Sequence, residues 1–320
     1  MTNACRRRLG ALLLLAACGA QAQVAKPLKI IVGFPPGGSA DVAARLVGER
    51  MATELERPVV IENKPGAGGR IAAELLKNAA ADGGTLMIAP VVVPVLAPMV
   101  FGRLGYDPAT DFAPVASVAN FQFGIVVAAS HPAKNLQELI AWYRANPRDA
   151  NFGSPAPGSL PHFFGTMLAR GAGVELVHVP FSGGAPLVTA IVGGQVSAGI
   201  DVLAEQVELH RSGKLRVLAT SGATRSTLLP EVPTAGESGL RGVEGSGWFA
   251  IYAPAKTPEA AIRLLNAAVN KALAAPELRD RFVQLGLEPT GGSPADLAAT
   301  MKRDAERWAP GVKASGFRGD

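Results

Sequence analysis

The sequence is poor in charged and aromatic residues, and its cysteines are confined to the first 18 positions. Charged residues make up 18% and aromatic residues 6% of the 320 residues, so a stacking platform for single-stranded nucleic acid is not expected. Cys5 and Cys18 are the two cysteines, and the chain after them therefore holds no disulfide, thiol nucleophile or thiolate metal site. Apolar residues reach 48%, which excludes a disordered chain.

The first 22 residues have the pattern of an export signal. Arg6 to Arg8 form a basic start, residues 9–17 are apolar but too short to span a bilayer, and Ala20-Gln21-Ala22 offers small residues for cleavage. The preferred outcome is a soluble periplasmic protein. Leu-Ala-Ala-Cys, ending at Cys18, resembles a lipobox, so a lipid anchor on Cys18 is the alternative.

Removal of residues 1–22 changes the charge balance. Three arginines and no acid leave, so the net charge falls from +5 to +2. A charge this small gives no reason to expect a nucleic acid partner. Beyond the leader, no apolar run is long enough to span a membrane.

The body of the chain alternates short apolar strands with amphipathic helices, which indicates α/β modules with parallel sheets. Asn135 and Glu138 have the spacing of a capping box and predict the start of one helix. The expected strands are 28–32, 58–61, 85–89, 151–153, 175–179, 198–202, 215–220 and 248–252. The expected helices with defined bounds are 159–170, 184–193, 204–212, 258–274, 276–285 and 294–309.

Glycine is concentrated in the loops that follow these strands. Gly37 and Gly38 follow the first strand, 66–69 follows the second, and Gly153 and Gly158 flank the loop after the strand at 151. Each loop leads into a helix, and a helix N-terminus has free N–H groups and a positive dipole end. We therefore expect a cleft at which helix N-termini bind an anion such as a carboxylate.

Motifs for catalysis and cofactor binding are missing from the sequence. It contains no GxSxG, HExxH or Walker A motif, and its four histidines are not spaced as metal ligands. GAGGRI is a poor dinucleotide fingerprint because Ile71 stands where a third glycine is required. Ser154 or Ser159 with His162 has no acid placed to orient the base, so capping or ligand binding is the preferred role of these serines. No catalytic residue, metal or cofactor is expected.

Seven runs of residues, spread over nearly the whole mature chain, resemble in the same order those of a known family. They are KIIVGFPPGGSADVAAR (29–45), ENKPGAGGRIAAE (62–74), DGGTLMIAP (82–90), YDPATDFAPVASV (106–118), NFGSPAPGSLPHFFG (151–165), HVPFSGGAPLVTAIVGGQV (178–196) and GKLRVLATSGATRSTLLPEVPTAGESG (213–239). The family is the Bug (TctC-type) family, the extracytoplasmic solute-binding proteins of tripartite tricarboxylate transporters.

The resemblance implies a two-lobed, type II-like periplasmic-binding-protein fold of two α/β domains joined by two crossover strands. Domain I would comprise residues 24–123 and 252–320, and domain II residues 124–251. The protein would act as a monomer that binds a small carboxylate and delivers it to the membrane subunits of such a transporter. The ligand-binding residues implied by matching motifs are Phe34, Gly38, Ser39, Asp41, Ala67, Gly68, Gly69, Ser154, Ser159, His162, Phe181 and Asp201.

Some of these residues have a second interpretation. Asp41 is equally expected to satisfy N–H groups at a helix start, and His162 to orient its loop. Asp201 would meet a ligand amine or hydroxyl, or anchor a neighbouring loop. Phe181-Ser182 replaces a tyrosine-lysine pair common in the family, and the loss of a hydroxyl and a cation favours an apolar or aromatic carboxylate over citrate.

Three other functions remain as alternatives. A periplasmic sensor subunit would share the same pocket and present its ligand to a receptor kinase. A secreted enzyme of similar fold would need a nucleophile or metal cluster that the sequence lacks. A transcription-factor effector domain is disfavoured by the leader and by the absence of a helix-turn-helix before residue 28.

Overall fold

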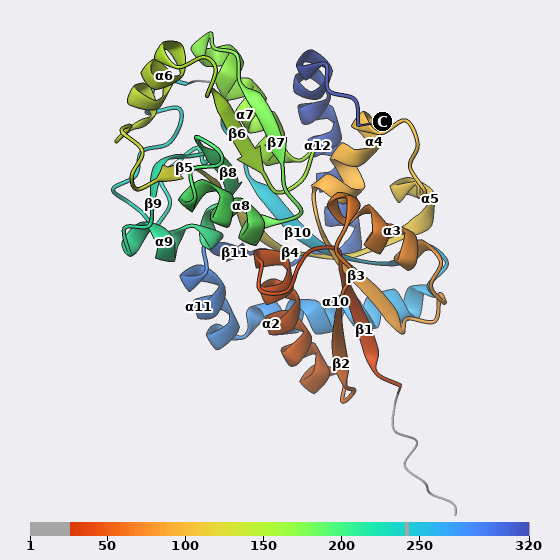
Figure 1. The fold of residues 1–320 in the computed structure, drawn as a ribbon. Helices are drawn as coiled ribbons and strands as arrows, with labels where there is room; N and C mark the ends of the chain where they lie inside the picture. The colour runs from red at the N-terminus through yellow and green to blue at the C-terminus, as the bar shows by residue number, and fades with distance from the viewer. Residues whose placement is uncertain (1–25, 241–242, 320) are drawn as a thin grey trace, which may run out of the picture.

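The computed structural model describes residues 26–240 and 243–319, which form two lobes, each built on one β-sheet (Figure 1). This confirms the two-lobed α/β fold expected from the sequence. The leader expected at 1–22 lies outside the described residues. In the part of the chain that is described, no helix has the length and apolar character needed to cross a membrane.

Lobe I contains a six-stranded sheet whose inner strands are almost entirely buried. In sheet order, the strands are β11 (Leu287–Pro289), β4 (Phe112–Phe121), β10 (Gly247–Pro254), β3 (Thr85–Pro90), β1 (Leu28–Val32) and β2 (Val59–Asn63). Strand β1 pairs in parallel with β2 and β3, so that Ile30 lies opposite both Ile61 and Leu86. The near-continuous apolar sequences of β1 and β3 fit strands that helices cover on both faces.

Lobe II contains a five-stranded sheet. In sheet order, its strands are β7 (Val177–Pro180), β6 (Asn151–Ser154), β8 (Gly199–Val202), β5 (Phe123–Ala128) and β9 (Leu215–Thr220). Strands β6, β7 and β8 run in parallel, whereas β5 is antiparallel to β8 and β9. The carboxyl ends of β6 and β8 therefore lie at one edge of the sheet, where α/β proteins bind ligands.

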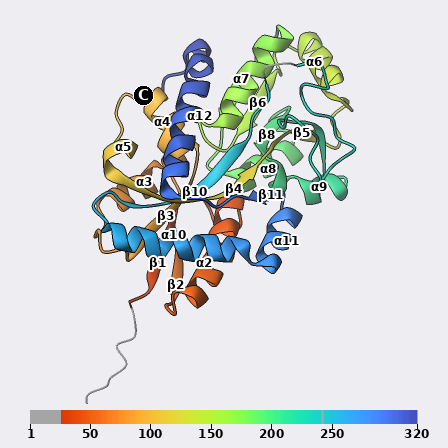
Figure 2. The same ribbon diagram turned by 180° about the vertical axis from the view of Figure 1, so that it is seen from behind.

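Helices cover both sheets (Figures 1 and 2). Those of lobe I are α2 (Ser39–Glu54), η1 (Ala67–Gly69), α3 (Arg70–Lys77), η2 (Val92–Leu96), α4 (Ala97–Val100), α5 (Pro108–Asp111), α10 (Glu259–Ala274), α11 (Pro276–Gln284) and α12 (Pro294–Ser315). Those of lobe II are α6 (Leu136–Ala145), α7 (Leu160–Ala172), α8 (Gly184–Val192), η3 (Leu203–Glu205) and α9 (Val207–Arg211). The predicted start of α6 is confirmed, because the Asn135 side chain accepts a hydrogen bond from Glu138 N at 2.9 Å.

The chain passes between the lobes twice. Strand β4 of lobe I leads through Gln122 alone into β5 of lobe II. The return passes through the segment between β9 and β10, and β10 pairs with β3 and β4 from Gly247 onward. The sequence placed this second crossover near 251, but the chain is already part of the lobe I sheet four residues earlier. Ser221 links the two passages, because its Oγ donates to Gly245 O at 2.7 Å and accepts from Phe123 N at 3.0 Å.

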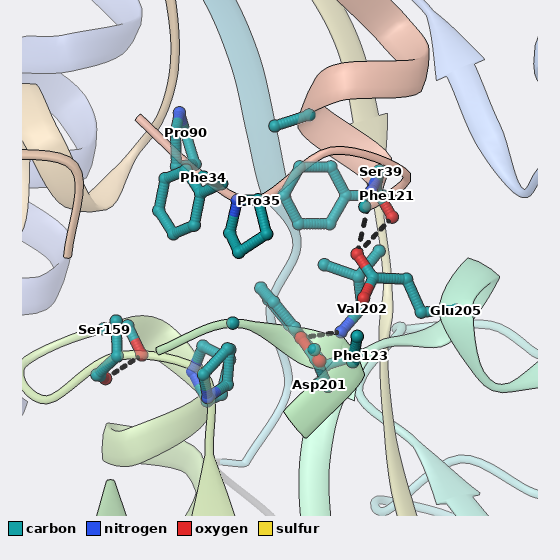
Figure 3. A pocket seen from close by; sticks show the side chains of 18 of the residues that line it. Phe34, Pro35, Ser39, Pro90, Phe121, Phe123, Ser159, Asp201, Val202 and Glu205 are labelled. Carbon is teal, nitrogen blue, oxygen red and sulfur yellow. Dashed lines mark hydrogen bonds between the residues drawn. The ribbon is translucent and has the colours of Figure 1, made fainter. Parts of the chain in front are cut away.

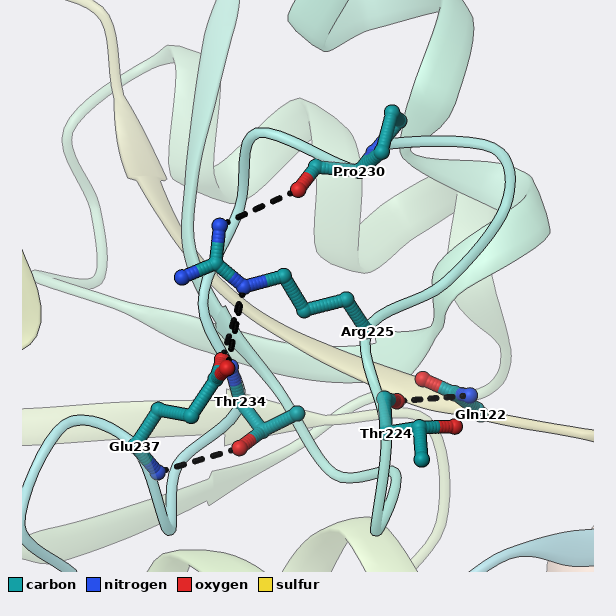
Figure 4. Close-up of polar contacts among 6 residues, drawn as sticks. All are labelled: Gln122, Thr224, Arg225, Pro230, Thr234 and Glu237. Carbon is teal, nitrogen blue, oxygen red and sulfur yellow. Dashed lines mark hydrogen bonds and ion pairs between the residues drawn. The ribbon is translucent and has the colours of Figure 1, made fainter.

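The loop that follows β9 is held by its own polar side chains (Figure 4). Glu237 accepts from Arg225 Nε at 2.8 Å and from Thr234 N at 2.8 Å, and its own N–H donates to Thr234 Oγ1 at 3.0 Å. This reciprocal pair has the chemistry of a capping box. Arg225 also donates to Pro230 O at 3.1 Å. These contacts give a fixed shape to a long loop whose described residues form no regular strand or α-helix.

Helix α12 belongs to lobe I but also contacts lobe II. It packs on β4 and along α7, and the Trp308 ring lies 5.9 Å from the Phe164 ring of α7. Beyond the helix, the Phe317 ring meets the His162 ring edge-on at 4.5 Å. The C-terminal segment therefore joins the lobes through apolar contacts, in addition to the two covalent crossovers.

Candidate functional site

A cavity of about 370 Å³ lies between the two lobes (Figure 3). Residues at or just beyond the carboxyl ends of β1 and β3 form its lobe I side, and those at the ends of β6 and β8 form its lobe II side. The size is typical of a cleft for a small organic ligand. Of the three glycine-rich loops expected at one cleft, those after β1 and β6 line this cavity, and the loop at 66–69 does not.

The wall of the cavity is mostly apolar. Phe121, Phe123 and Phe249 come from the crossover strands, and Phe34 comes from the loop after β1. The Phe121 ring lies 4.4 Å from that of Phe249 and 5.4 Å from that of Phe123, so these three form one aromatic surface. Prolines complete the apolar lining: Pro35, Pro36, Pro90, Pro155 and Pro161.

Three helix N-termini reach this cavity. Helix α2 begins at Ser39, α7 follows its N-cap residue Ser159, and α8 begins at Gly184. Free N–H groups and the positive ends of the helix dipoles favour a negatively charged group there. The sequence predicted the first two. The third, α8, takes the place that had been assigned to the helix after the second glycine-rich loop.

The structure separates the twelve expected ligand-binding residues into two groups. Those that line the cavity are Phe34, Gly38, Ser39, Ser159 and Asp201. Those that lie behind its wall are Asp41, Ala67, Gly68, Gly69, Ser154, His162 and Phe181. The second group supports the loops that carry the first.

Asp41 is buried in lobe I and holds the loop between β1 and α2. Its Oδ2 accepts from Gly37 N at 2.9 Å and Arg45 Nε at 2.8 Å, and its Oδ1 accepts from Asn63 Nδ2 at 2.9 Å. Asn63 also donates to Phe34 O at 3.1 Å. Burial by itself would raise the pKa of Asp41, but the hydrogen bonds from Arg45, Gly37 and Asn63 outweigh it and lower the pKa.

The second glycine-rich loop packs against the first. Ala67, Gly68 and Gly69 have φ of 50°, 64° and 90°, a region that favours glycine. A Cβ on Gly33 would lie 2.7 Å from Gly69 Cα, and a Cβ on Gly69 would lie 3.2 Å from the Phe34 ring. These glycines allow two backbones to approach closely, and this contact positions Phe34 at the cavity.

A pair of stacked histidines holds the loop between β6 and α7. The rings of His162 and His178 lie 3.8 Å apart and nearly parallel. Gly158 N donates to His162 Nδ1 at 3.0 Å, and Ser154 Oγ lies 2.8 Å from His178 Nε2. Burial lowers the pKa of His162 to about 3 and that of His178 to about 4, and the neighbouring His178 adds to the effect on His162. Histidines with such low pKa values are poor bases at neutral pH, and neither ring is among the residues that line the cavity.

Ser159 and Phe181 have packing roles that the sequence did not define. Ser159 Oγ donates to Ala156 O at 2.6 Å, which turns the hydroxyl towards its own loop. The Phe181 ring covers β6, where a Cβ on Gly153 would lie 2.9 Å from it. Phe181 packs with a second apolar cluster in lobe II. The phenylalanine that stands where the family commonly has tyrosine therefore lies behind the cavity wall.

Two acids of lobe II line the cavity, Asp201, which was expected from the sequence, and Glu205, which was not. Asp201 lies one residue before the end of β8 and is 2% exposed, and Glu205 ends η3 four residues later. Glu205 Oε1 accepts hydrogen bonds from both N and Oγ of Ser39, each 2.8 Å long. Burial, reinforced by the nearby Glu205, raises the pKa of Asp201 well above its usual range. The sequence offered one indication that Glu205 also lies at the site: it is an acid four residues after Asp201.

The cavity contains little polar chemistry beyond these acids. No lysine, arginine or histidine occurs among its described lining residues. Across residues 26–240 and 243–319, no three His, Cys, Asp or Glu side chains gather as a metal site. The arrangement is suited to enclosing an organic molecule with an apolar body.

Comparisons with known proteins support this interpretation. The model of the tripartite tricarboxylate transporter family receptor, TctC, matches residues 43–317. BugT of Bordetella pertussis is 33% identical over 295 residues, which cover 92% of this chain and 90% of BugT.

Two solved structures of similar sequence share the fold. A protein of Rhodopseudomonas palustris solved with adipate has a TM-score of 0.88 at 33% identity, covering 91% of this chain and 98% of its own. MatC of the same organism, solved with bound malate, has a TM-score of 0.84 at 33% identity, covering 89% of this chain and 98% of its own. With a family model that matches most of its length and relatives of this similarity, the chain belongs to the tripartite tricarboxylate transporter receptor (TctC, Bug-type) family.

Proposed function

We propose that the protein is an exported solute-binding protein that captures a small carboxylate with an apolar or aromatic body. The observation that supports this most is the apolar cavity between the lobes, which three helix N-termini reach. Helix ends bind a carboxylate through N–H groups without needing an arginine. Two similar proteins solved with adipate and malate add support for a carboxylate.

The proposed contacts are the five expected residues that line the cavity: Phe34, Gly38, Ser39, Ser159 and Asp201. The phenylalanine rings would cover the apolar body, and the N–H groups at the starts of α2, α7 and α8 would face the carboxylate, except that of Ser39, which donates to Glu205 Oε1. Asp41, His162 and the glycines at 66–69 would act through the loops that they hold. The protein would have no catalytic residue.

In the proposed cycle, the two lobes move as domains about the crossovers at Gln122 and 221–246. Ligand binding would shift the protein towards the closed form by the difference in affinity between the two forms. The closed monomer in the periplasm would then deliver its ligand to the membrane subunits of a tripartite tricarboxylate transporter.

Thermal unfolding followed by calorimetry tests the proposal. We expect an aromatic or branched monocarboxylate at a hundred times its Kd to stabilise the protein by about 2.7 kcal/mol, which raises the Tm by roughly 5 °C. The carboxamide of the same acid is the matched control, because it keeps the shape and loses the charge that the helix ends favour. Equal stabilisation by acid and amide, or no binding by any carboxylate in a broad panel, would contradict the proposal.

A further inference from the structure

The lobe II wall of the cavity contains two carboxyl groups that approach the same point. A Cβ added to Gly184 would lie 1.8 Å from Oε2 of Glu205 and 2.7 Å from Oδ2 of Asp201. The missing side chain at Gly184 is therefore what makes room for both acids. Figure 3 shows Glu205 and Asp201 on the same side of the cavity, below Ser39.

The two acids differ in how they are satisfied. Glu205 Oε1 accepts two hydrogen bonds from Ser39, across the cleft from lobe I. Asp201 Oδ1 accepts from Val202 N at 2.7 Å, but Asp201 Oδ2 is buried and has no hydrogen-bond partner in the protein. A buried oxygen without a donor costs free energy, and a ligand that supplies the donor recovers it.

The remaining lining offers no positive charge to balance these acids. The described lining residues include no basic side chain, whereas the aromatic rings of Phe34, Phe121, Phe123 and Phe249 are present. A second carboxylate on the ligand would find no basic side chain at this wall and would lie beside the Glu205 carboxyl group. A cation would be attracted to the acids and would find favourable ring faces beside them.

We infer that Glu205 and Asp201 select a ligand that bears an ammonium group, which donates hydrogen bonds to Asp201 Oδ2 and Glu205 Oε2. This inference rests on the proposed function, and it narrows the substrate class to zwitterions with an apolar body. The carboxylate of the ligand would face the helix N-termini and the ammonium group would face the acids. Simple dicarboxylates would bind poorly, and Glu205 would be a specificity-determining residue.

The test compares ligands that share one carbon skeleton. Phenylalanine, 3-phenylpropanoate and 2-phenylethylamine form one set, and leucine, 4-methylpentanoate and isopentylamine form another. Binding is measured by isothermal titration calorimetry in buffer with EDTA, so that no metal ion supplies the positive charge. We expect a zwitterion of at least one set to bind about 10- to 100-fold more tightly than its deaminated acid, the range that a charged hydrogen bond provides.

Two variants separate the acid wall from general effects. Glu205→Gln keeps an oxygen that accepts from Ser39, so it should fold normally and reduce the zwitterion-to-acid ratio about tenfold or more. Glu208→Gln is the matched control, because Glu208 is an exposed acid three residues along the chain whose partner is Arg211. This control should leave the ratio unchanged. Asp201→Asn supplies a second variant that should also reduce the ratio.

The possible outcomes distinguish this inference from the proposed function. If the deaminated acid binds as tightly as the zwitterion, or if Glu205→Gln leaves the ratio unchanged, the inference is overturned while carboxylate binding stands. If the amine without a carboxylate binds as tightly as the zwitterion, the acid wall is supported and the proposed carboxylate site is wrong. If no ammonium-bearing probe binds, the inference is overturned.

Discussion

Replacement of Asp41 by asparagine tests whether this buried acid builds the site without touching the ligand. The Asp41 side chain is 3% exposed and accepts three hydrogen bonds, from Gly37 N, Arg45 Nε and Asn63 Nδ2. Asparagine has one oxygen and one amide NH₂. If the NH₂ group faces Asn63, one bond is lost, and if it faces Gly37 and Arg45, two are lost.

The expected cost follows from these contacts. A hydrogen bond to a charged group contributes about 1.5–3 kcal/mol, and a buried donor without an acceptor adds to the loss. The Arg45 side chain is 53% exposed, so solvent weakens the electrostatic attraction between Arg45 and Asp41. We therefore expect Asp41→Asn to lower the free energy of unfolding by roughly 2–4 kcal/mol, which corresponds to a fall in Tm of about 3–7 °C.

Differential scanning calorimetry and ligand titration measure the two consequences. Asp107→Asn is the matched control, because exposed Asp107 caps α5 by accepting from Ala109 N at 2.9 Å, and asparagine is an equally good N-cap. Its Tm should change by less than about 2 °C. Asp41→Asn should weaken all ligands by a similar factor, because Asp41 acts through the loop. An unchanged Tm, or the loss of one ligand class alone, would refute this reasoning.

Three further predictions follow from other contacts. Burial holds the pKa of His162 near 3 and that of His178 near 4. The two histidines therefore leave the free energy of unfolding unchanged above pH 6.5 and lower it as the pH falls towards 4, by about 1.4 kcal/mol per pH unit for each histidine. Equal urea midpoints at pH 7 and pH 5 would contradict this. Gly184→Ala should weaken ligand binding at least about tenfold and lower the Tm by roughly 2–5 °C, because its methyl group meets the two carboxyl groups of the cavity. Gly311→Ala, in open space on α12, is the control and should bind normally. Ser221→Ala removes two buried hydrogen bonds between the crossover segments and should cost about 1–3 kcal/mol in a denaturant titration; a loss below 0.5 kcal/mol would show that the passages are not coupled there.

The sequence predicted most elements whose pattern is local. The strands at 28–32 and 215–220 were predicted with their observed bounds, because apolar runs between turn signals define them. Strand β4 was missed because FAPVASVANF mixes small, polar and apolar residues without a clear period. The helix expected at 204–212 divides into η3 and α9, and Gln206 between them donates to Gly124 O at 3.3 Å. That contact comes from a distant strand and leaves no local signal.

The candidate site was predictable where one loop carried the whole signal. Gly38, Ser39, Ser159 and Asp201 were implied by motifs that resemble those of the family, and each of them lies close to the end of a strand or the start of a helix. Phe121, Phe123 and Phe249 meet only because two crossover strands pass the cavity, which depends on the topology of both sheets. The glycines at 66–69 do not line the cavity, and their sequence could not show this, because the same residue type serves close backbone packing and anion binding.

The C-terminal segment has a mechanical consequence for the motion of the lobes. The contacts that join the lobes among the described residues include the crossover strands, the packing of Trp308 and Phe317 against α7, and the two hydrogen bonds between Ser39 and Glu205. Covalent chain and packed rings resist separation, whereas two hydrogen bonds exchange readily with water. The lobes would therefore separate by rotating about α12 and the crossover segments. The side of the cleft that holds Ser39 and Glu205 would part first, and the ligand would enter there.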